Sequence, residues 1–163
     1  GLNGVSPDGR WLGIFRPFST SLSIYRLPGF EPIAKLSRPT YFRDFQFSPV
    51  GDEVAITSDR TGVEFWSTAT WARTGSLTNF IRLLYTPDAH ALWLQNDQRD
   101  PGLYDARTLE PLLLLPTGML PLALSENGQR VAVSVDAQRL QLWDLAELRL
   151  RLRELGLDWA VNQ

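Results

Sequence analysis

Short runs of alternating apolar and polar residues follow one another along the chain, and turn residues separate them. Residues 42–47 alternate strictly, and residues 53–58 are rich in β-branched side chains. Alternation with a period of two is typical of a half-buried strand, and β-branched residues favour strands. Residues 48–52 between them contain Pro and Gly, whose backbone preferences suit a tight turn. This stretch therefore predicts two antiparallel strands joined by a turn.

Two more strands complete the unit. Residues 63–66 form a short apolar run after a second turn, and residues 71–77 form a weaker run after a third. A weak last run is expected, because the outermost strand of a small sheet faces solvent and is loosely specified. The pattern thus predicts a four-stranded antiparallel sheet within about 40 residues.

The same unit recurs four times. The first turn of each unit opens at Ser6, Ser48, Thr86 and Ser125, so the steps are 42, 38 and 39 residues. An aromatic residue follows each opening at a distance of 18 or 19 residues: Tyr25, Trp66, Tyr104 and Trp143. A period of about 40 residues with four strands per repeat is the signature of a propeller. We therefore predict an all-β propeller fold, in a closed or incomplete ring, with four blades at residues 1–37, 42–78, 80–116 and 119–144.

The fourth strand of the last unit is replaced by a different pattern. Asp144 and Glu147 form a capping box, and Gly156 suits the position just past a helix end. Four leucines fall on one helical face: Leu145, Leu148, Leu152 and Leu155. Residues 148–153 also alternate as a strand would, but they are strong helix formers without β-branching. We predict a short helix over residues 145–155.

Composition limits the function. A net charge of −2 gives no pull toward nucleic acid or an anionic membrane. No apolar stretch reaches the length of a membrane span, and residues 1–5 do not resemble a signal peptide. The absence of Cys excludes a disulfide framework and a thiolate metal site. We expect a cytoplasmic protein without nucleic-acid binding or membrane insertion, whose first residues enter part-way through a repeat.

Catalytic patterns are missing. His90 is the only imidazole, and the chain has neither a nucleophile elbow nor a phosphate-binding Gly-rich loop with Lys. Asn96, Asp97 and Asp100 supply oxygen ligands but lack the spacing of a calcium loop. We interpret His90 and this cluster as turn residues, and expect no enzyme activity, no cofactor and no metal site.

Two sequence motifs resemble those of a known family. The turn at residues 6–10, Ser-Pro-Asp-Gly-Arg, and the strand at residues 140–145, Leu-Gln-Leu-Trp-Asp-Leu, resemble the repeats of WD40 propellers. The end of the chain is similar to the close of bacterial multidomain WD40 proteins, some of which carry a protein kinase upstream. The resemblance implies a scaffold for protein–protein interactions.

The family's buried hydrogen-bond network is incomplete here. Many WD40 repeats use a Gly-His pair together with Asp, Ser or Thr, and Trp. His90 is in the wrong place for that pair, so the resemblance implies that only parts of the network persist. We expect those parts to join Ser58 to Trp66 and Ser134 to Trp143.

Loops at one end of the predicted blades supply the candidate binding residues. Residues 41–43 and 80–82 occupy matching positions in adjacent repeats, and each contains an aromatic residue and Arg. Aromatic residues and Arg are enriched at interfaces. The predicted partner-binding residues are Tyr41, Arg43, Phe80, Arg82, Arg60, Arg99, Met119 and Arg139. Arg16, Phe18, Arg38 and Asp97 are predicted on the same loop face. The alternative is that aromatic residues at strand starts pack inside.

Three functions stay open. The first is a non-catalytic scaffold that docks a peptide or domain on this loop face. The second is a carbohydrate-binding or enzymatic propeller, which needs convergent acids and exposed Trp. The third is a purely structural part of a larger propeller in a multidomain protein. Unpaired blade edges also offer a route to a homodimer.

Overall fold

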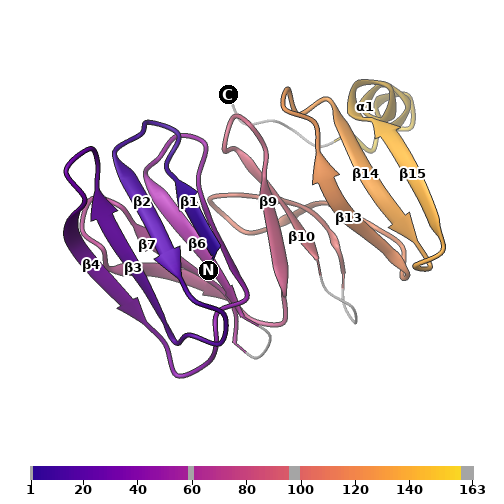
Figure 1. The fold of residues 1–163 in the computed structure, drawn as a ribbon. Helices are drawn as coiled ribbons and strands as arrows, with labels where there is room; N and C mark the ends of the chain where they lie inside the picture. The colour runs from indigo at the N-terminus through magenta and orange to yellow at the C-terminus, as the bar shows by residue number, and fades with distance from the viewer. Residues whose placement is uncertain (1, 59–60, 96–99, 159–163) are drawn as a thin grey trace. The chain divides into compact units, whose positions relative to one another are not determined.

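The computed structural model describes residues 2–58, 61–95 and 100–158. In these ranges the protein consists of four antiparallel sheets of four, four, four and three strands, and one C-terminal helix (Figure 1). The predicted all-β fold class is confirmed, and the sheets are consistent with propeller-like blades. The chain divides into two compact units, Gly1–Leu83 and Leu84–Gln163, which are described separately.

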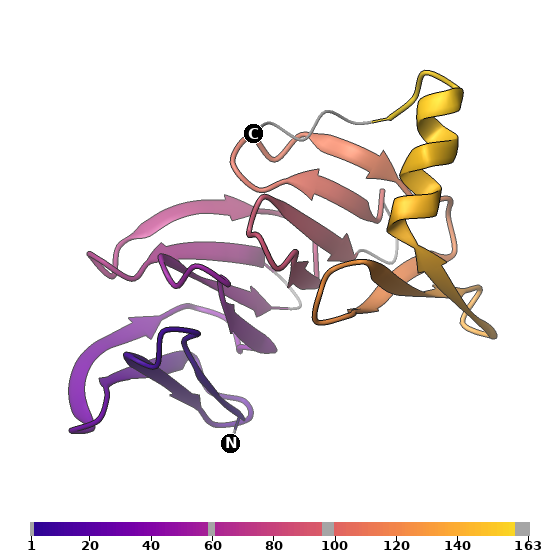
Figure 2. The same ribbon diagram turned by 90° about the horizontal axis from the view of Figure 1, so that it is seen from above.

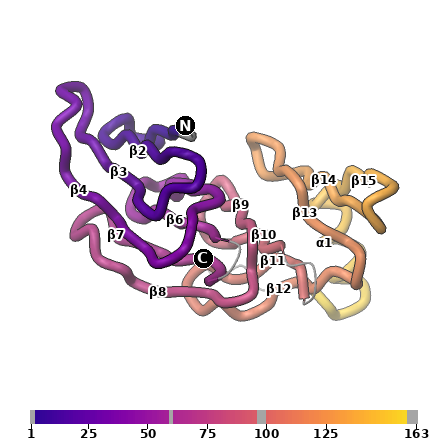
Figure 3. Tube along the Cα trace, turned by 60° about the horizontal axis from the view of Figure 1, so that its bottom comes forward, coloured from indigo at the N-terminus to yellow at the C-terminus, as the bar shows by residue number. Residues whose placement is uncertain are grey.

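Each sheet follows the order of the sequence, so the chain runs up and down from strand to strand (Figure 3). The first sheet contains β1 (Leu2–Val5), β2 (Trp11–Phe15), β3 (Ser21–Arg26) and β4 (Glu31–Ser37). The second contains β5 (Asp44–Phe47), β6 (Glu53–Ser58), β7 (Gly62–Ser67) and β8 (Arg73–Leu77). The third contains β9 (Arg82–Tyr85), β10 (Ala91–Gln95), β11 (Gly102–Asp105) and β12 (Pro111–Leu114). The fourth contains β13 (Met119–Leu124), β14 (Arg130–Val135) and β15 (Arg139–Asp144).

The repeated opening residue has a local structural role. The backbone N–H of Trp11 donates to the Ser6 hydroxyl at 2.9 Å, and that hydroxyl donates to Asp8 at 2.6 Å. Thr86 and Ser125 accept the N–H of the residue five positions later in the same way. The bond from Ser6, with help from Arg10, lowers the pKa of Asp8 to about 2. The turn is therefore held by an ionised carboxylate at neutral pH.

The core of the first unit lies between its two sheets. Phe15, Leu22 and Ile24 of the first sheet share one buried cluster with Val54 and Ile56 of the second. Because buried apolar side chains stabilise a fold in proportion to the area removed from water, this face-to-face contact holds the two sheets together. We call the face of a sheet that packs on the next sheet its trailing face, and the opposite face its leading face.

The second unit repeats this arrangement. Trp93 and Leu103 on the trailing face of the third sheet share a cluster with Val131 and Val133 on the leading face of the fourth. Val131 and Val133 have no exposed surface. Both units are therefore built by the same rule, in which a trailing face packs on the leading face of the sheet that follows.

The expected Ser–Trp hydrogen bonds are not formed. The indole N–H of Trp66 donates to Glu64 at 3.3 Å, while Ser58 bonds to Thr61. The indole N–H of Trp143 donates to Gln141 at 2.8 Å. The prediction was wrong because each indole reaches a side chain two residues earlier on its own strand.

Arg38 turns inward, which corrects its predicted place on the loop face. Its side chain is 1% exposed, and its Nε lies 3.1 Å from an oxygen of Glu64. A second guanidinium nitrogen donates to the carbonyl of Ile56 at 3.3 Å, and a third to the Thr61 hydroxyl. Burial lowers the pKa of Arg38, and the charge of Glu64 opposes that shift. The pair therefore ties the β4–β5 connection to the second sheet.

The predicted C-terminal helix is present as α1 (Leu145–Glu154), beyond the end of β15 (Figure 2). Asp144 accepts the backbone N–H groups of Ala146 and Glu147, as an N-cap does. At the other end Gly156 has a φ of 70° and bonds back to Arg153, which closes the helix. Within the described part of the chain no helix is long and apolar enough to cross a membrane.

Candidate functional site

Two exposed aromatic rings meet at one end of the first unit. Phe18, in the β2–β3 turn, is 81% exposed, and Tyr41, in the β4–β5 connection, is 62% exposed. Their ring centroids are 6.2 Å apart and the planes are nearly perpendicular. Edge-to-face contact is a favourable aromatic geometry. The sequence placed both residues on one face, and the structure brings them into contact.

Backbone hydrogen bonds hold the two loops side by side. The N–H of Arg38 donates to the carbonyl of Thr20 at 2.9 Å, and the N–H of Phe42 donates to Ser19 at 3.0 Å. Phe42 packs in the core beneath, so it follows the alternative in which such aromatic residues point inside. The buried Arg38 and Phe42 thus support an exposed Tyr41 between them.

The backbone of Phe18 is strained. The turn of residues 16–19 is closed by a bond from Ser19 N–H to the carbonyl of Arg16 at 2.9 Å. Phe18 is its third residue and has a φ of 61°, a conformation that favours Gly. Such a conformation costs of order 1 kcal/mol or more for a residue with a Cβ, and it is often kept at functional sites. Despite this cost, the turn places a large, exposed apolar ring at its tip.

Two arginines accompany these rings. Arg16 is exposed in the same turn as Phe18, and Arg43 is exposed two residues after Tyr41. We call Arg16, Phe18, Tyr41 and Arg43 the aromatic patch. It offers apolar surface and positive charge together, which suits a partner with apolar and acidic groups.

The other predicted binding residues differ in exposure. Phe80 is half-buried before β9, and Arg82 is exposed at its first residue. In the second unit Met119 is half-buried against the cluster of Trp93 and Val133, and Arg139 is exposed, 3.7 Å from Asp136. Arg60, Arg99 and Asp97 lie outside the described residues. The aromatic patch is therefore the part of the predicted surface where the structure brings several of the predicted residues together.

The residues considered for catalysis or metal binding do not come together as such a site in the described ranges. His90 is exposed, as a turn residue would be, and its backbone N–H donates to Asp88 at 3.0 Å. No group of three His, Asp or Glu side chains that could hold a metal ion occurs among residues 2–58, 61–95 and 100–158. Asn96 of the acidic turn lies outside these ranges, as does Asp97.

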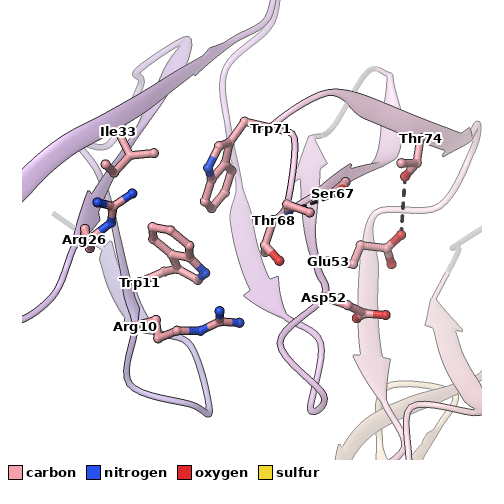
Figure 4. Close-up of a pocket in the computed structure, with 11 residues that line it drawn as sticks. Arg10, Trp11, Arg26, Ile33, Asp52, Glu53, Ser67, Thr68, Trp71 and Thr74 are labelled. Carbon is pink, nitrogen blue, oxygen red and sulfur yellow. Dashed lines mark hydrogen bonds between the residues drawn. The ribbon is translucent and has the colours of Figure 1, made fainter.

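A pocket of about 790 Å³ lies between the two sheets of the first unit, at the opposite strand ends from the aromatic patch. Trp11 and Trp71 meet there edge to face, with ring centroids 5.2 Å apart (Figure 4). The guanidinium groups of Arg10 and Arg26 each lie 5.8 Å from the Trp11 ring, close enough for cation–π attraction. The pocket therefore has an aromatic and cationic side.

Carboxylates and hydroxyls form its other side (Figure 4). Asp52 accepts the Ser48 hydroxyl at 2.5 Å, and Glu53 accepts the Thr74 hydroxyl at 3.4 Å. Within the described part of the chain the buried indole N–H of Trp11 has no hydrogen-bond partner. Rings beside several donors and acceptors suit a small polar ligand.

Sequence reasoning missed this pocket. A signal was present: Trp11 directly follows the first turn phrase, and Trp71 lies in the turn after the third strand of the next repeat. In an up-and-down sheet these two positions fall at the same strand ends.

No family model matches the chain, and no curated protein matches it. The case for function therefore rests on the aromatic patch and the pocket.

Proposed function

We propose that this chain is a non-catalytic interaction module that binds a peptide or a loop of a partner protein through the aromatic patch. The observation that carries the proposal is the exposed pair Phe18–Tyr41, held at one end of a packed two-sheet unit. Binding residues concentrate on loops that a rigid scaffold positions. Exposed aromatic rings with Arg beside them are the usual anchors of such contacts.

We further propose that the four sheets are WD40-like blades. Support comes from the repeated turn phrase, from the Trp-Asp pair that ends β15, and from four small antiparallel sheets in sequence order. In this proposal the patch belongs to the loop face that propellers use for docking partners. The partner's binding segment carries apolar and acidic residues, because the patch supplies two aromatic rings and two arginines.

The patch can be tested with one variant that separates binding from stability. We expect Phe18→Gly to weaken peptide binding by about tenfold or more, as loss of an aromatic anchor does. The same change should leave stability unchanged or raise it by about 1 kcal/mol, because Gly tolerates the positive φ. Peptides selected by phage display on the wild-type chain serve as probes, with Kd read by fluorescence anisotropy and stability by urea unfolding.

Tyr41→Ala should weaken the same peptides to a similar extent. Phe30 provides a matched control, because it is also exposed and also has a positive φ but lies in the β3–β4 turn at the opposite strand ends. Phe30→Gly should therefore leave binding intact. Selected peptides that bind Phe18→Gly and Tyr41→Ala as tightly as the wild type would show that the patch is not the docking site.

A second candidate function is the binding of a carbohydrate or similar polar ligand in the Trp11–Trp71 pocket. The observation that favours it is the combination of two indole rings with Arg10, Asp52 and Glu53 in one cavity. Rings pack on the apolar faces of sugars, while charged groups bind their hydroxyls.

A glycan array tests this candidate. Wild-type protein and Phe18→Gly should bind the same glycans, whereas Trp71→Ala should lose about tenfold in affinity because an aromatic wall is removed. Trp71 is half-buried at the pocket, so circular dichroism should check that its variant is folded. Absence of any glycan binding by the wild-type chain would leave the peptide-binding proposal as the sole function.

A further inference from the structure

The fourth sheet has one covered face and one open face. Its leading face carries Val131, Val133 and Val135, which are at most 4% exposed. Its trailing face carries Leu140 and Leu142, which are 69% and 65% exposed. Exposed apolar patches on a folded protein usually mark an interaction surface.

Strand register shows that this exposure departs from the pattern of the other sheets. Leu142 pairs with Ala132 in the β14–β15 ladder. The equivalent residues are Ile24, Phe65 and Leu103, opposite Gly13, Ala55 and Trp93. These three side chains are 0%, 5% and 4% exposed. The position of Leu142 is therefore buried in each of the other three sheets.

The first sheet has the complementary open face. Val5 and Ile14 on its leading face are 54% and 38% exposed, and Leu12 and Tyr25 beside them are half-buried. Ile56 and Val133, which occupy the position of Ile14 in the second and fourth sheets, have no exposed surface. The positions named on the two open faces all carry apolar or aromatic side chains.

The two open faces are the two halves of a contact that the chain already makes. Ile24 shares a cluster with Ile56 in the first unit, and Leu103 shares one with Val133 in the second. If a trailing face always packs on the leading face of another sheet, Leu142 should pack against a residue in the position of Ile14. Each chain therefore has one exposed trailing face, on its fourth sheet, and one exposed leading face, on its first sheet.

We propose that a second copy of this chain covers the open trailing face, with its Ile14 face packed on Leu140 and Leu142. The contact is heterologous, so a pair of chains closes only if both junctions form. Two chains then contribute eight sheets, within the range of propellers. This goes beyond the peptide-binding proposal and does not depend on it, because the aromatic patch lies on loops and not on these faces.

The absence of Cys allows a direct test by cross-linking. Leu142→Cys and Ile14→Cys are prepared as separate proteins, mixed in equal amounts and treated with a short bismaleimide. A specific junction holds the two thiols at high effective concentration, so we expect about tenfold more two-chain product than for Leu150→Cys mixed with Ile14→Cys. Leu150 is a matched control, since it is 54% exposed but lies on α1.

Light scattering provides the second readout. The wild-type chain should have twice the 18.4 kDa mass of one chain, Leu142→Glu should have the mass of one chain, and Leu150→Glu should keep the doubled mass. Leu142 is exposed in a single chain, so its substitution should leave the circular dichroism spectrum unchanged.

Three outcomes would overturn the proposal. A single-chain mass for the wild type at millimolar concentration shows that no second copy binds. Two-chain product from Leu142→Cys alone shows that two trailing faces meet. Cross-linking within one chain of the double variant Ile14→Cys/Leu142→Cys shows that the chain covers its own open faces.

Discussion

Glu64→Ala is expected to lower the free energy of unfolding of the first unit by about 3–5 kcal/mol, because it leaves a buried charge without its partner. The side chain of Arg38 is 1% exposed and that of Glu64 is 11% exposed. Glu64 also accepts the indole N–H of Trp66 and lies 3.4 Å from Arg73. Removing its carboxylate therefore leaves the Arg38 guanidinium without its ion-pair partner and the Trp66 indole N–H without its acceptor.

Two controls make this result specific. Arg73 is 57% exposed, so Arg73→Ala should cost less than about 1 kcal/mol, as exposed ion pairs do. Arg38→Met removes the buried cation instead and should cost less than Glu64→Ala, because the Glu64 carboxylate keeps Arg73 and the Trp66 indole N–H as partners. Urea unfolding measures all three. A loss below 1 kcal/mol for Glu64→Ala would show that water reaches Arg38.

Trp93→Ala is the second large effect and falls in the second unit. Trp93 has no exposed surface and packs among Ala91, Leu103, Val131 and Val133. Truncation of a buried Trp removes apolar contacts and leaves a cavity, at a cost of about 3–5 kcal/mol. Fluorescence-detected urea unfolding should show the loss in the transition of this unit.

Trp93→Phe separates packing from hydrogen bonding. Within the described part of the chain the buried indole N–H of Trp93 has no hydrogen-bond partner. Phe keeps most of the ring and removes that donor, so we expect a smaller loss than for Ala, about 1–2 kcal/mol. Leu150→Ala, on the exposed side of α1, should change stability by less than about 0.5 kcal/mol. Equal losses for Trp93→Phe and Trp93→Ala would contradict the packing argument.

The proposed binding and assembly surfaces are separable by mutation. Phe18 lies at the tip of the β2–β3 turn, whereas Ile14 lies within β2 on the leading face of the same sheet. Phe18→Gly should therefore weaken peptide binding without changing the mass in solution. Ile14→Glu should release single chains that still bind peptide.

The local elements follow from short stretches of the amino-acid sequence. The strands follow from alternation, because side chains two residues apart share one face of a strand. The repeated Ser or Thr marks a turn because its hydroxyl bonds the backbone five residues later, as in Ser6 and Trp11. The helix after Asp144 follows from its caps and leucines. All these features depend on residues within a few positions of one another.

Which side chains meet across the sheets depends on the folded structure as a whole. Nothing near Arg38 signals that it turns inward, because its partner Glu64 is 26 residues away. Trp66 and Trp143 bond residues that the family resemblance did not indicate. The Trp11–Trp71 pocket and the open face of Leu142 likewise depend on how whole sheets pack. Such contacts arise from the packing of separate strands, which the local pattern of one strand does not encode.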